Sequence, residues 1–389
     1  MADVKLQTIP VGALSIIAMQ NIRPLAEKVD SYIAEWRKER EANIGDEGLH
    51  FRGYQKDSYL VETATPRFGS GEGKGQIKDS VRGTDIFIMI DVLNWSLTYS
   101  LNGIPNHMSP DDHYADLKRI IGAICGKANR VSVIMPFLYC SRQHRRTGRE
   151  SLDCAVMLQE LVRAGVSNII TFDAHDPRVA NSIPNNGFEN FSCTYQFIKK
   201  IVYDTPDLKI DGDHLMIISP DEGGMNRAIT FANYLNVNVG MFYKRRDYTR
   251  IVDGTNPIVA HEYLGQDVDG MDVLIVDDMI SSGGSMLEVA AELKKRKANR
   301  VFCLSTYGLF TNGMEKFDKA YADGIIHRVY TTNLTYQRPE LLQREYYGTV
   351  DLSKYIALII DNLNHNNTLS DLLVPTERIN RFLDKNVRK

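Results

Sequence analysis

A chain of 389 residues is long enough to form two or three domains, each with a substantial hydrophobic core. Its hydrophobic (43%) and charged (24%) fractions are typical of a globular protein, and without a run of about 18 apolar residues the sequence predicts no transmembrane helix. The net charge of −3 gives no general electrostatic reason to expect nucleic acid or an anionic membrane as a partner, so we expect neither.

The N-terminal region predicts a strand followed by a helix. The start, MADVKLQTIPVGALSIIAMQ, lacks the basic n-region and cleavage pattern of a signal peptide, so its apolar part favours a strand. Pro24 suits the first turn of a helix over residues 23–43. One apolar stripe runs along this helix, formed by Leu25, Val29, Tyr32, Ile33 and Trp36. We assign residues 1–48 to an N-terminal extension with a structural helix.

Apolar, β-rich runs recur along the rest of the chain and alternate with amphipathic helical patterns. These runs are residues 84–93, 130–139, 167–176, 214–222, 238–246, 271–278 and 299–308. Such alternation implies parallel sheets with right-handed crossovers, which is an α/β fold class. The segment 94–112 is an insertion-like stretch between the first two of these runs.

A short internal repeat predicts two similar domains. The sequence KANRV occurs at residues 127–131 and again at 297–301, each time between a helical pattern and an apolar run. A turn-rich region near residues 184–210 is the expected connection. We therefore expect two α/β domains and a C-terminal helical tail, at residues 49–184, 185–350 and 351–389.

Five scattered cysteines bear on the compartment of the protein. Their odd number and the absence of a CxxC spacing favour neither a disulfide framework nor a zinc site. Most are expected to be small buried residues in a reducing environment, which predicts a cytoplasmic location.

The stretch 273–296, VLIVDDMISSGGSMLEVAAELKKR, carries the clearest chemistry. Asp277 and Asp278 stand at the expected carboxyl end of a strand, where open parallel sheets bind ligands. Their carboxylates can hold vicinal hydroxyls, directly or through Mg²⁺. A small-residue loop at the start of the next helix can hold one phosphate; it comprises Ser281, Ser282, Gly283, Gly284 and Ser285. Together these features favour a ribose 5-phosphate site over a simple capped turn.

A basic cluster follows the run at 130–139. It consists of Arg142, Arg145, Arg146 and Arg149. Arginine suits bidentate phosphate contacts, and the carboxyl end of a strand is where a ligand is expected. A polyanionic ligand such as ATP is therefore preferred to a solvated basic turn or an RNA-binding patch.

Several segments resemble motifs of the ribose-phosphate diphosphokinase (phosphoribosyl pyrophosphate synthetase) family. The loop after Asp278 resembles its phosphoribosyl-binding loop, which type I phosphoribosyltransferases share. RFGSGE (67–72) resembles its adenine-contacting hairpin. Other matches follow in the family's order; they are SVRG (80–83), SRQHRRTGRES (141–151), TFDAHD (171–176), SPDEGGMNRA (219–228) and YKRR (243–246). The resemblance covers about residues 66–310 and implies two similar Rossmann-like, phosphoribosyltransferase-type domains with parallel sheets.

The resemblance implies transfer of the diphosphoryl group of ATP to O1 of ribose 5-phosphate, with Mg²⁺, in nucleotide biosynthesis. The N-terminal domain would bind ATP through Phe68, Ser70, Glu72, Arg142, Gln143, Arg145, Arg146 and His175. The C-terminal domain would bind ribose 5-phosphate through Asp277, Asp278 and the loop residues from Ser281 to Ser285. The implied pyrophosphate loop is Asp221, Gly223 and Gly224. The implied metal ligands are Asp173, His175 and Asp221.

Lys244 and Arg246 are the catalytic residues that the resemblance implies. They precede DYTRIVDGTNP (247–257), a polar segment suited to a lid. The family also implies a homo-oligomer in which Phe68 reaches the ATP site of a neighbouring subunit.

The sequence departs from the family pattern near these ligands. Ser281 replaces an acid of the phosphoribosyl loop, Gly283 replaces an alanine, Ser70 stands where an aspartate is usual, and Asn186 takes the place of another aspartate. Two alternatives stay open. One is a non-catalytic nucleotide-binding homologue that regulates a true synthetase, against which the retained Lys244 and Arg246 argue. The other is a phosphoribosyltransferase that uses a base, against which the ATP-type segments argue.

Overall fold

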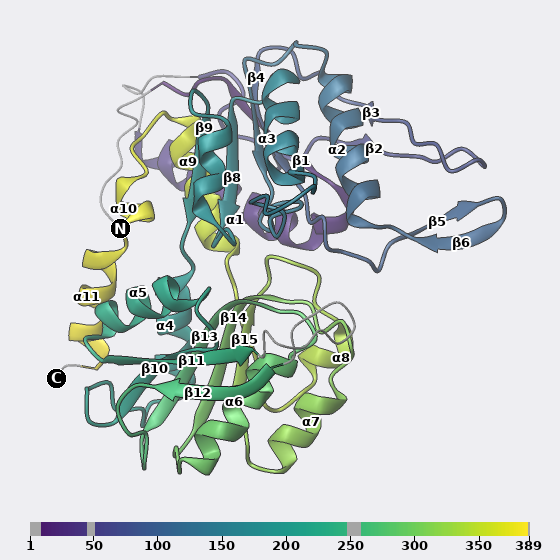
Figure 1. Cartoon of the computed structure of the whole chain (residues 1–389). Coiled ribbons are helices and arrows are strands. Elements are labelled where there is room, and N and C mark those ends of the chain that lie inside the picture. Colours follow the sequence, from purple (N-terminus) through teal and green to yellow (C-terminus); the bar gives the residue numbers. More distant parts are fainter. Residues whose placement is uncertain (1–8, 45–50, 247–257, 388–389) are drawn as a thin grey trace. The chain divides into compact units, whose positions relative to one another are not determined.

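A computed structural model describes residues 9–44, 51–246 and 258–387 (Figure 1). The chain forms two compact units built from alternating segments. Unit 1 contains Met1–Ser192, Asn333–Tyr336 and Asp351–Val374. Unit 2 contains Cys193–Thr332, Gln337–Val350 and Pro375–Lys389.

Unit 1 is built on a five-stranded sheet in the order β1-β4-β7-β8-β9, and all neighbouring strands are parallel. The strands are β1 (Ala13–Ala18), β4 (Thr84–Met89), β7 (Arg130–Ile134), β8 (Asn168–Phe172) and β9 (Gly187–Phe191). The predicted strands in this region are confirmed. The last, β9, was not predicted, because its residues are mostly half-buried and have no alternating apolar pattern.

The helices of unit 1 come from both ends of the chain. They are α1 (Arg23–Ile44), α2 (Pro110–Ile124), α3 (Asp153–Arg163), α9 (Ser353–Asn364) and α10 (Ser370–Leu373), with short 3₁₀ turns at Gln20–Ile22 and Pro177–Ser182. Helix α2 begins with a capping box, in which Ser109 and Asp112 exchange hydrogen bonds. The predicted helix over 23–43 is confirmed.

The two chain ends of unit 1 are joined by a buried polar contact that the predicted domain boundaries did not include. Arg37 of α1 is fully buried, and its guanidinium donates to Asp361 (3.2 Å) and Asn364 (2.7 Å) of α9. Strand β1 also pairs with β4. The described residues 9–44, together with 351–374, therefore belong to unit 1 rather than to a separate extension and tail, because their apolar faces complete its core.

Unit 2 is built on a seven-stranded sheet in the order β12-β11-β10-β13-β14-β15-β16. The strands are β10 (Leu215–Ser219), β11 (Asn238–Arg246), β12 (Ile258–Leu264), β13 (Asp272–Ile280), β14 (Val301–Gly308), β15 (Arg328–Thr332) and β16 (Tyr347–Val350). All neighbours are parallel except the edge strand β12, which is antiparallel to β11. The α/β architecture with parallel sheets is thus as predicted.

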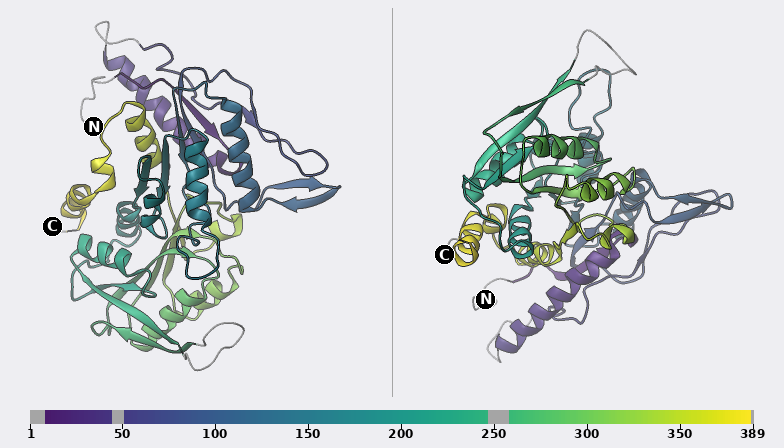
Figure 2. Two further views of the ribbon diagram at one scale, coloured as in Figure 1. Left: turned by 45° about the horizontal axis from the view of Figure 1, so that its top comes forward. Right: turned by 90° about the horizontal axis from the view of Figure 1, so that it is seen from below.

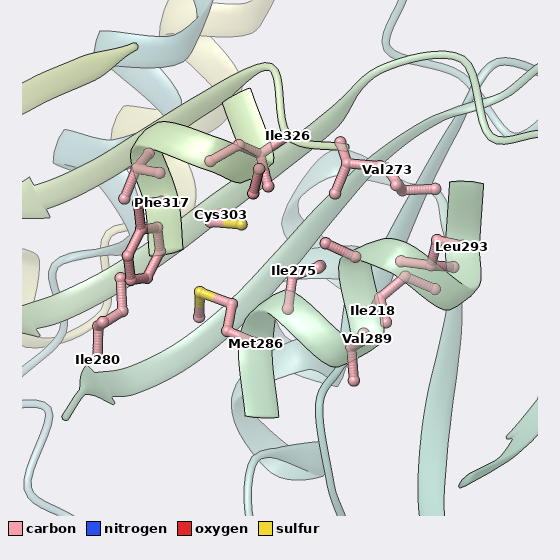
Figure 3. Close-up of a cluster of buried hydrophobic side chains, with 14 of the residues drawn as sticks. Ile218, Val273, Ile275, Ile280, Met286, Val289, Leu293, Cys303, Phe317 and Ile326 are labelled. Carbon is pink, nitrogen blue, oxygen red and sulfur yellow. The ribbon is translucent and has the colours of Figure 1, made fainter. Parts of the chain in front are cut away.

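The helices of unit 2 are α4 (Thr194–Asp204), α5 (Met225–Leu235), α6 (Gly284–Lys295), α7 (Glu315–Ala322), α8 (Pro339–Leu342) and α11 (Thr376–Asn386). The predicted stripe of α6, which includes Met286, Val289 and Leu293, is buried against β13 residues such as Val273 and Ile275 (Figure 3). Helix α11 packs on α4, where the ring of Phe382 contacts Tyr203 edge-on at 5.5 Å. No helix of the described residues is long and apolar enough to cross a bilayer.

Two hairpins extend from the sheet of unit 1. The first joins β2 (Thr63–Ala64) to β3 (Gln76–Ile77), and the second joins β5 (Thr98–Leu101) to β6 (Ile104–His107). Figures 1 and 2 show both hairpins on the same side of unit 1, beside α2. The insertion-like segment 94–112 therefore forms the second hairpin and leads into α2.

Candidate active site

The carboxyl end of β13 places the two predicted aspartates in different environments. The strand continues to Ile280, so both residues lie inside it rather than at its turning end, which corrects the prediction. Successive strand residues point to opposite faces. The side chain of Asp277 keeps 25% of its surface exposed, whereas Asp278 is only 5% exposed.

The electrostatics of this pair favour a positively charged or hydroxyl-bearing ligand. Burial and the neighbouring Asp278 raise the pKa of Asp277 well above its usual value, and Arg227 of α5 opposes the rise. The Arg227 Nη1 atom lies 3.9 Å from Asp277 Oδ1. The backbone N–H of Asp278 donates to that same oxygen at 2.8 Å. A cation or a pair of hydroxyl donors would therefore stabilise the ionised form of Asp277.

The loop after β13 has the form of a phosphate cradle. Ser281 and Ser282 are half-buried, Ser285 is exposed, and helix α6 begins at Gly284. Gly283 has φ +79°, and a side chain there would overlap the ring of Phe317. Glycine is therefore required at this turn. The first turn of α6 directs backbone N–H groups out of the helix, as anion sites require.

The loop after β10 lies beside this cradle. Strands β10 and β13 are parallel neighbours, so their carboxyl ends share one edge of the sheet. Asp221 Oδ1 accepts the N–H of Gly224 at 3.2 Å, and the Ser219 hydroxyl donates to the Asp221 carbonyl at 2.7 Å. A Cβ on Gly224 would lie 2.9 Å from Ser219 Oγ, so the turn requires glycine, while Gly223 is exposed. The structure thus brings Asp221 and both glycines to the edge that carries Asp277.

The predicted catalytic pair belongs to the next strand of the same sheet. Lys244 and Arg246 lie in β11, where Lys244 pairs with His261 and Arg246 with Ile258 of β12. Strand β11 is parallel to β10, and Ser219, the last residue of β10, pairs with Met241. Lys244 and Arg246 therefore lie beyond the carboxyl end of β10. The predicted lid, residues 247–257, lies outside the described residues.

In unit 1, the loop after β7 presents the predicted basic cluster. Arg142, Arg145 and Arg146 are exposed. Gln143 instead closes the loop: its side-chain amide donates to the Ser151 carbonyl at 2.9 Å, and its backbone N–H donates to Cys140 at 2.8 Å. The exposed positions of these arginines suit contact with an anionic ligand. Contact between the Gln143 amide group and a purine would instead replace the bond to Ser151.

Asp173 and His175 follow β8, the neighbour of β7. Asp173 has φ +39°, in the left-handed region that few non-glycine residues adopt. Its N–H donates to Phe191 O at 2.9 Å, which helps to fix this turn. Such strain is often found at functional sites. His175 is exposed, as a ligand-binding histidine must be.

His144 is a neighbour of His175 that the sequence analysis did not select. The two rings meet edge-on with centroids 5.2 Å apart. His144 Nε2 lies 3.5 Å from Asp176 Oδ2. The Arg178 guanidinium is the main cause that lowers the pKa of Asp176, to about 2, and His144 adds a smaller effect. The signal in the sequence was a histidine inside the basic loop, three residues after Ser141.

The predicted metal ligands do not form a complete metal site. Among the residues that the structure describes, no three His, Cys, Asp or Glu side chains gather to hold a metal ion. Asp173 and His175 belong to unit 1, and Asp221 belongs to unit 2. Mg²⁺ usually takes one or two carboxylates from the protein and its other ligands from substrate phosphates and water. Asp173 in unit 1 and Asp221 in unit 2 each offer one carboxylate of this kind.

Phe68 lies at the tip of the first hairpin and is 58% exposed, so the alternative of a core phenylalanine is excluded. Its N–H donates to Glu72 O at 2.8 Å, and its carbonyl accepts the N–H of Gly71 at 2.8 Å. The Ser70 hydroxyl donates to the Glu72 carboxylate at 2.8 Å. An exposed aromatic ring on a tight turn is suited to stacking on a planar base.

Two family models match the chain, one in each unit. Residues 14–165 match the N-terminal domain of ribose phosphate pyrophosphokinase. Residues 194–343 match the phosphoribosyl transferase domain. Together they include β7, β10, β11 and β13, whereas β8, which Asp173 and His175 follow, lies between the two matched ranges.

Curated relatives and a solved structure agree with these matches. The chain is 27% identical over 317 residues to a ribose-phosphate pyrophosphokinase of Vibrio parahaemolyticus, covering 80% of this chain and 90% of that protein. It is 28% identical to the protein of the same name from Pasteurella multocida, with the same coverage. The crystal structure of phosphoribosylpyrophosphate synthetase from Mycobacterium smegmatis has the same fold, with a TM-score of 0.69, 20% identity, and coverage of 91% of this chain and 99% of that one.

Proposed function

The chain belongs to the ribose-phosphate pyrophosphokinase family, and on this premise we propose that it transfers the diphosphoryl group of ATP to O1 of ribose 5-phosphate. The products are phosphoribosyl pyrophosphate and AMP. The observation that carries the proposal is the shared edge of β10, β11 and β13, which combines Asp277, a glycine-dependent phosphate cradle and two cationic residues. A carboxylate can bind the free hydroxyls of a phosphorylated sugar, and the cradle can bind its phosphate. The two cationic residues can stabilise the negative charge of the transferred group.

The acceptor site assigns a role to each part of this edge. The cradle from Ser281 to Ser285 binds the 5-phosphate through backbone N–H groups and hydroxyls. Asp277 accepts from ribose hydroxyls, and Asp278 supports it from the buried side of the strand. The Asp221 loop leaves space for the diphosphoryl group beside Gly223, which is exposed and carries no side chain.

The donor is ATP, for which the exposed arginines of the β7 loop and His175 are the proposed ligands. Phe68 stacks on the adenine, and Ser70 and Glu72 hold the turn that presents it. Arginine forks match phosphate oxygens. When bound, Mg²⁺ would neutralise charge on the phosphates. Asp173 is the side chain of unit 1 suited to hold a cation, and Asp221 is that of unit 2.

In the reaction, O1 of ribose 5-phosphate attacks the β-phosphorus of ATP. The bond from that phosphorus to the oxygen bridging to the α-phosphate breaks, AMP leaves with that oxygen, and the hydroxyl proton is lost to solvent. Lys244 and Arg246 stabilise the charge that develops on the transferred group. Charge stabilisation of this kind raises kcat more than it strengthens ground-state binding.

The enzyme works as a homo-oligomer in the cytoplasm, with Phe68 acting on the ATP site of a neighbouring subunit. All five cysteines are free thiols, which agrees with a reducing compartment. The shared site is tested by mixing Phe68→Ala protein with Lys244→Ala protein under conditions of verified subunit exchange. Recovery of activity is expected, and its absence would argue for a site within one chain.

The direct test of function is an AMP-release assay with ATP, Mg²⁺ and ribose 5-phosphate. Turnover that requires all three is the expected result. The non-catalytic alternative rests on the uncharged Ser70 and Ser281, and it predicts no turnover with any divalent metal. Wild-type protein that is silent beside an active Ser70→Asp/Ser281→Asp double variant would overturn the enzyme assignment.

A further inference from the structure

The hairpin that carries Phe68 is held at its tip by the hydrogen bonds of the turn, but its strands are short. Its strands β2 and β3 are two residues long, and one further bridge joins Arg67 to Gly73. Four glycines lie between Phe68 and Gln76, which increases the backbone freedom of the tip. An isolated two-stranded hairpin is marginally stable in water. An exposed ring at such a tip would lose much conformational entropy when it stacks on a base.

The second hairpin supplies restraints at this tip. The N–H of Asn102 donates to the carbonyl of Gly69 at 2.9 Å. Gly71 has φ +92°, and a Cβ there would lie 2.7 Å from Leu101 Cδ1, so the Leu101 side chain rests directly on this glycine. The restraint is therefore applied at the two glycines that flank Ser70, one or three positions from Phe68.

The base of the first hairpin is held by the same element together with α2. The Arg67 guanidinium lies 5.2 Å from the centre of the Tyr99 ring, in a cation–π arrangement. It also forms a bidentate pair with Asp116 of α2, at 2.7 and 2.8 Å. Tyr99 in turn accepts from the Asn106 side chain at 3.2 Å. Arg67 thus lies between a fixed carboxylate and the second hairpin.

The second hairpin contributes little to the core of unit 1. The residues of β5 alternate between exposed and half-buried, and all four residues of β6 are exposed. Its tip, Asn102-Gly103, has positive φ at both positions (50° and 81°), which suits a tight two-residue hairpin turn. This hairpin buries few residues, yet it contacts the tip of the first hairpin at Gly69 and Gly71. Support of that tip explains the second hairpin better than a contribution to the core does.

We infer that the hairpin over residues 95–107 is a positioning element for ATP, and that Tyr99 and Leu101 are positioning residues that act through Phe68. This inference rests on the proposed function, since it assigns Phe68 to the base. By restricting the Phe68 tip before the nucleotide binds, the hairpin lowers the entropy cost of stacking. The effect is the same whichever subunit's nucleotide Phe68 contacts.

The test compares Tyr99→Ala/Leu101→Ala with Ile104→Ala in the full-length protein. Ile104 is a matched control, because it lies on the same hairpin and is 69% exposed. ATP and ribose 5-phosphate affinities are measured separately by calorimetry, and thermal unfolding is recorded for each variant. The double variant should weaken ATP binding by about 10-fold, which is the scale of one aromatic stacking contact. Its ribose 5-phosphate affinity and Tm should match the wild type, as should every property of Ile104→Ala.

A double-mutant cycle with Phe68→Ala shows whether the effect passes through that ring. In the Phe68→Ala background, Tyr99→Ala/Leu101→Ala should cause no further loss of ATP affinity. Full additivity, an unchanged ATP affinity of the double variant, or equal losses for both substrates would each overturn the inference. If the wild type turns over and the Tyr99→Ala/Leu101→Ala variant keeps its ATP affinity, the inference is refuted and the proposed function stands. If the wild type binds ATP without turnover, the proposed function is refuted. The ATP affinities of the wild type and the variants would still test the inference.

Discussion

At the amino ends of two neighbouring strands, the two units have the same set of loop contacts, which we call the corner of each unit. At the carboxyl ends of the strands their loops differ. In unit 1, Gly83 N donates to Lys127 O, Asn129 N donates to Thr84 O, and Arg130 forms a bidentate pair with Asp85. In unit 2, the same three contacts recur at positions given by the second KANRV copy; they join Gly270 to Lys297, Asn299 to Met271, and Arg300 to Asp272.

The carboxyl ends share no such pattern. Unit 1 places exposed arginines and two adjacent histidines there, whereas unit 2 places two turns that require glycine and the adjacent carboxylates of Asp277 and Asp278. The repeated sequence therefore marks a structural requirement of the fold, and the chemistry lies where the two units differ. Parallel sheets bind ligands at the carboxyl edge, so the amino-end corners are free to remain alike.

The largest expected effect distinguishes the two corners. Arg130→Ala should lower the free energy of unfolding by about 3–5 kcal/mol, because Asp85 is fully buried and would keep a charge without its main partner. Arg300→Ala should cost less, about 1–3 kcal/mol, since Asp272 is 7% exposed and water can reach it. Each aspartate keeps one asparagine donor at 2.9 Å, Asn364 for Asp85 and Asn299 for Asp272, so the difference between the two variants reflects burial. Denaturant unfolding measures both.

Lys297→Ala is the control for the corners. Lys297 makes an exposed ion pair with Asp269, so its loss should change stability by at most about 0.5 kcal/mol. Folded Arg130→Ala and Arg300→Ala proteins should keep the wild-type KM for both substrates. A KM effect without a stability effect would show that a corner takes part in binding.

Lys244→Ala tests the carboxyl edge of unit 2. The expected result is a fall in kcat of about 100-fold or more, the usual cost of removing one group that stabilises transition-state charge. The affinity for ribose 5-phosphate should change far less, because that interaction is made in the transition state. Lys295→Ala, an exposed lysine of α6, is the matched control. Unchanged kcat in Lys244→Ala would refute the catalytic role.

Asp277→Asn tests how much stability the protein loses by placing the carboxylates of Asp277 and Asp278 side by side. The folded state raises the pKa of Asp277, so it retains a proton that the unfolded chain releases above pH of about 4. The wild type therefore loses stability as the pH rises above 4. The free energy of unfolding of the variant should exceed that of the wild type by on the order of 1 kcal/mol at pH 8, and by less at pH 5. Calorimetry should also show weaker ribose 5-phosphate binding. An equal Tm difference at both pH values would contradict the pKa argument.

The smallest effect is expected at Ser281. Ser281→Asp adds a negative charge beside the proposed phosphate cradle and also an acceptor for a ribose hydroxyl, so the two effects oppose each other. Partly exposed charge effects are about 1 kcal/mol or less. The KM for ribose 5-phosphate should therefore change by less than about 10-fold, and turnover should persist. Steady-state kinetics check this, and loss of all turnover would show that Ser281 has a role that a carboxylate cannot replace.

Apolar runs in the sequence predicted the α/β fold class correctly, and residues that are adjacent in the chain supplied the residues proposed for the site. The strands β4, β7, β8, β10, β13 and β14 were predicted from apolar runs, because burial on both faces leaves a local signal. Strand β11 was predicted although its burial alternates, and the buried β15 was not predicted. The cradle after Asp278 was predicted for a similar reason, since its glycine and serine residues are adjacent in the chain. The half-buried β9 and the short β16 carry no such local signal.

The contacts between distant segments became visible only in the folded chain. It joined Arg37 to Asp361 across 324 positions, placed His144 against His175, and set Asn102 against Gly69. It also extended β13 past the aspartates, so that one is buried and the other keeps access to solvent. Local patterns report the burial of a residue, but a contact between distant side chains depends on packing that no single stretch of sequence contains.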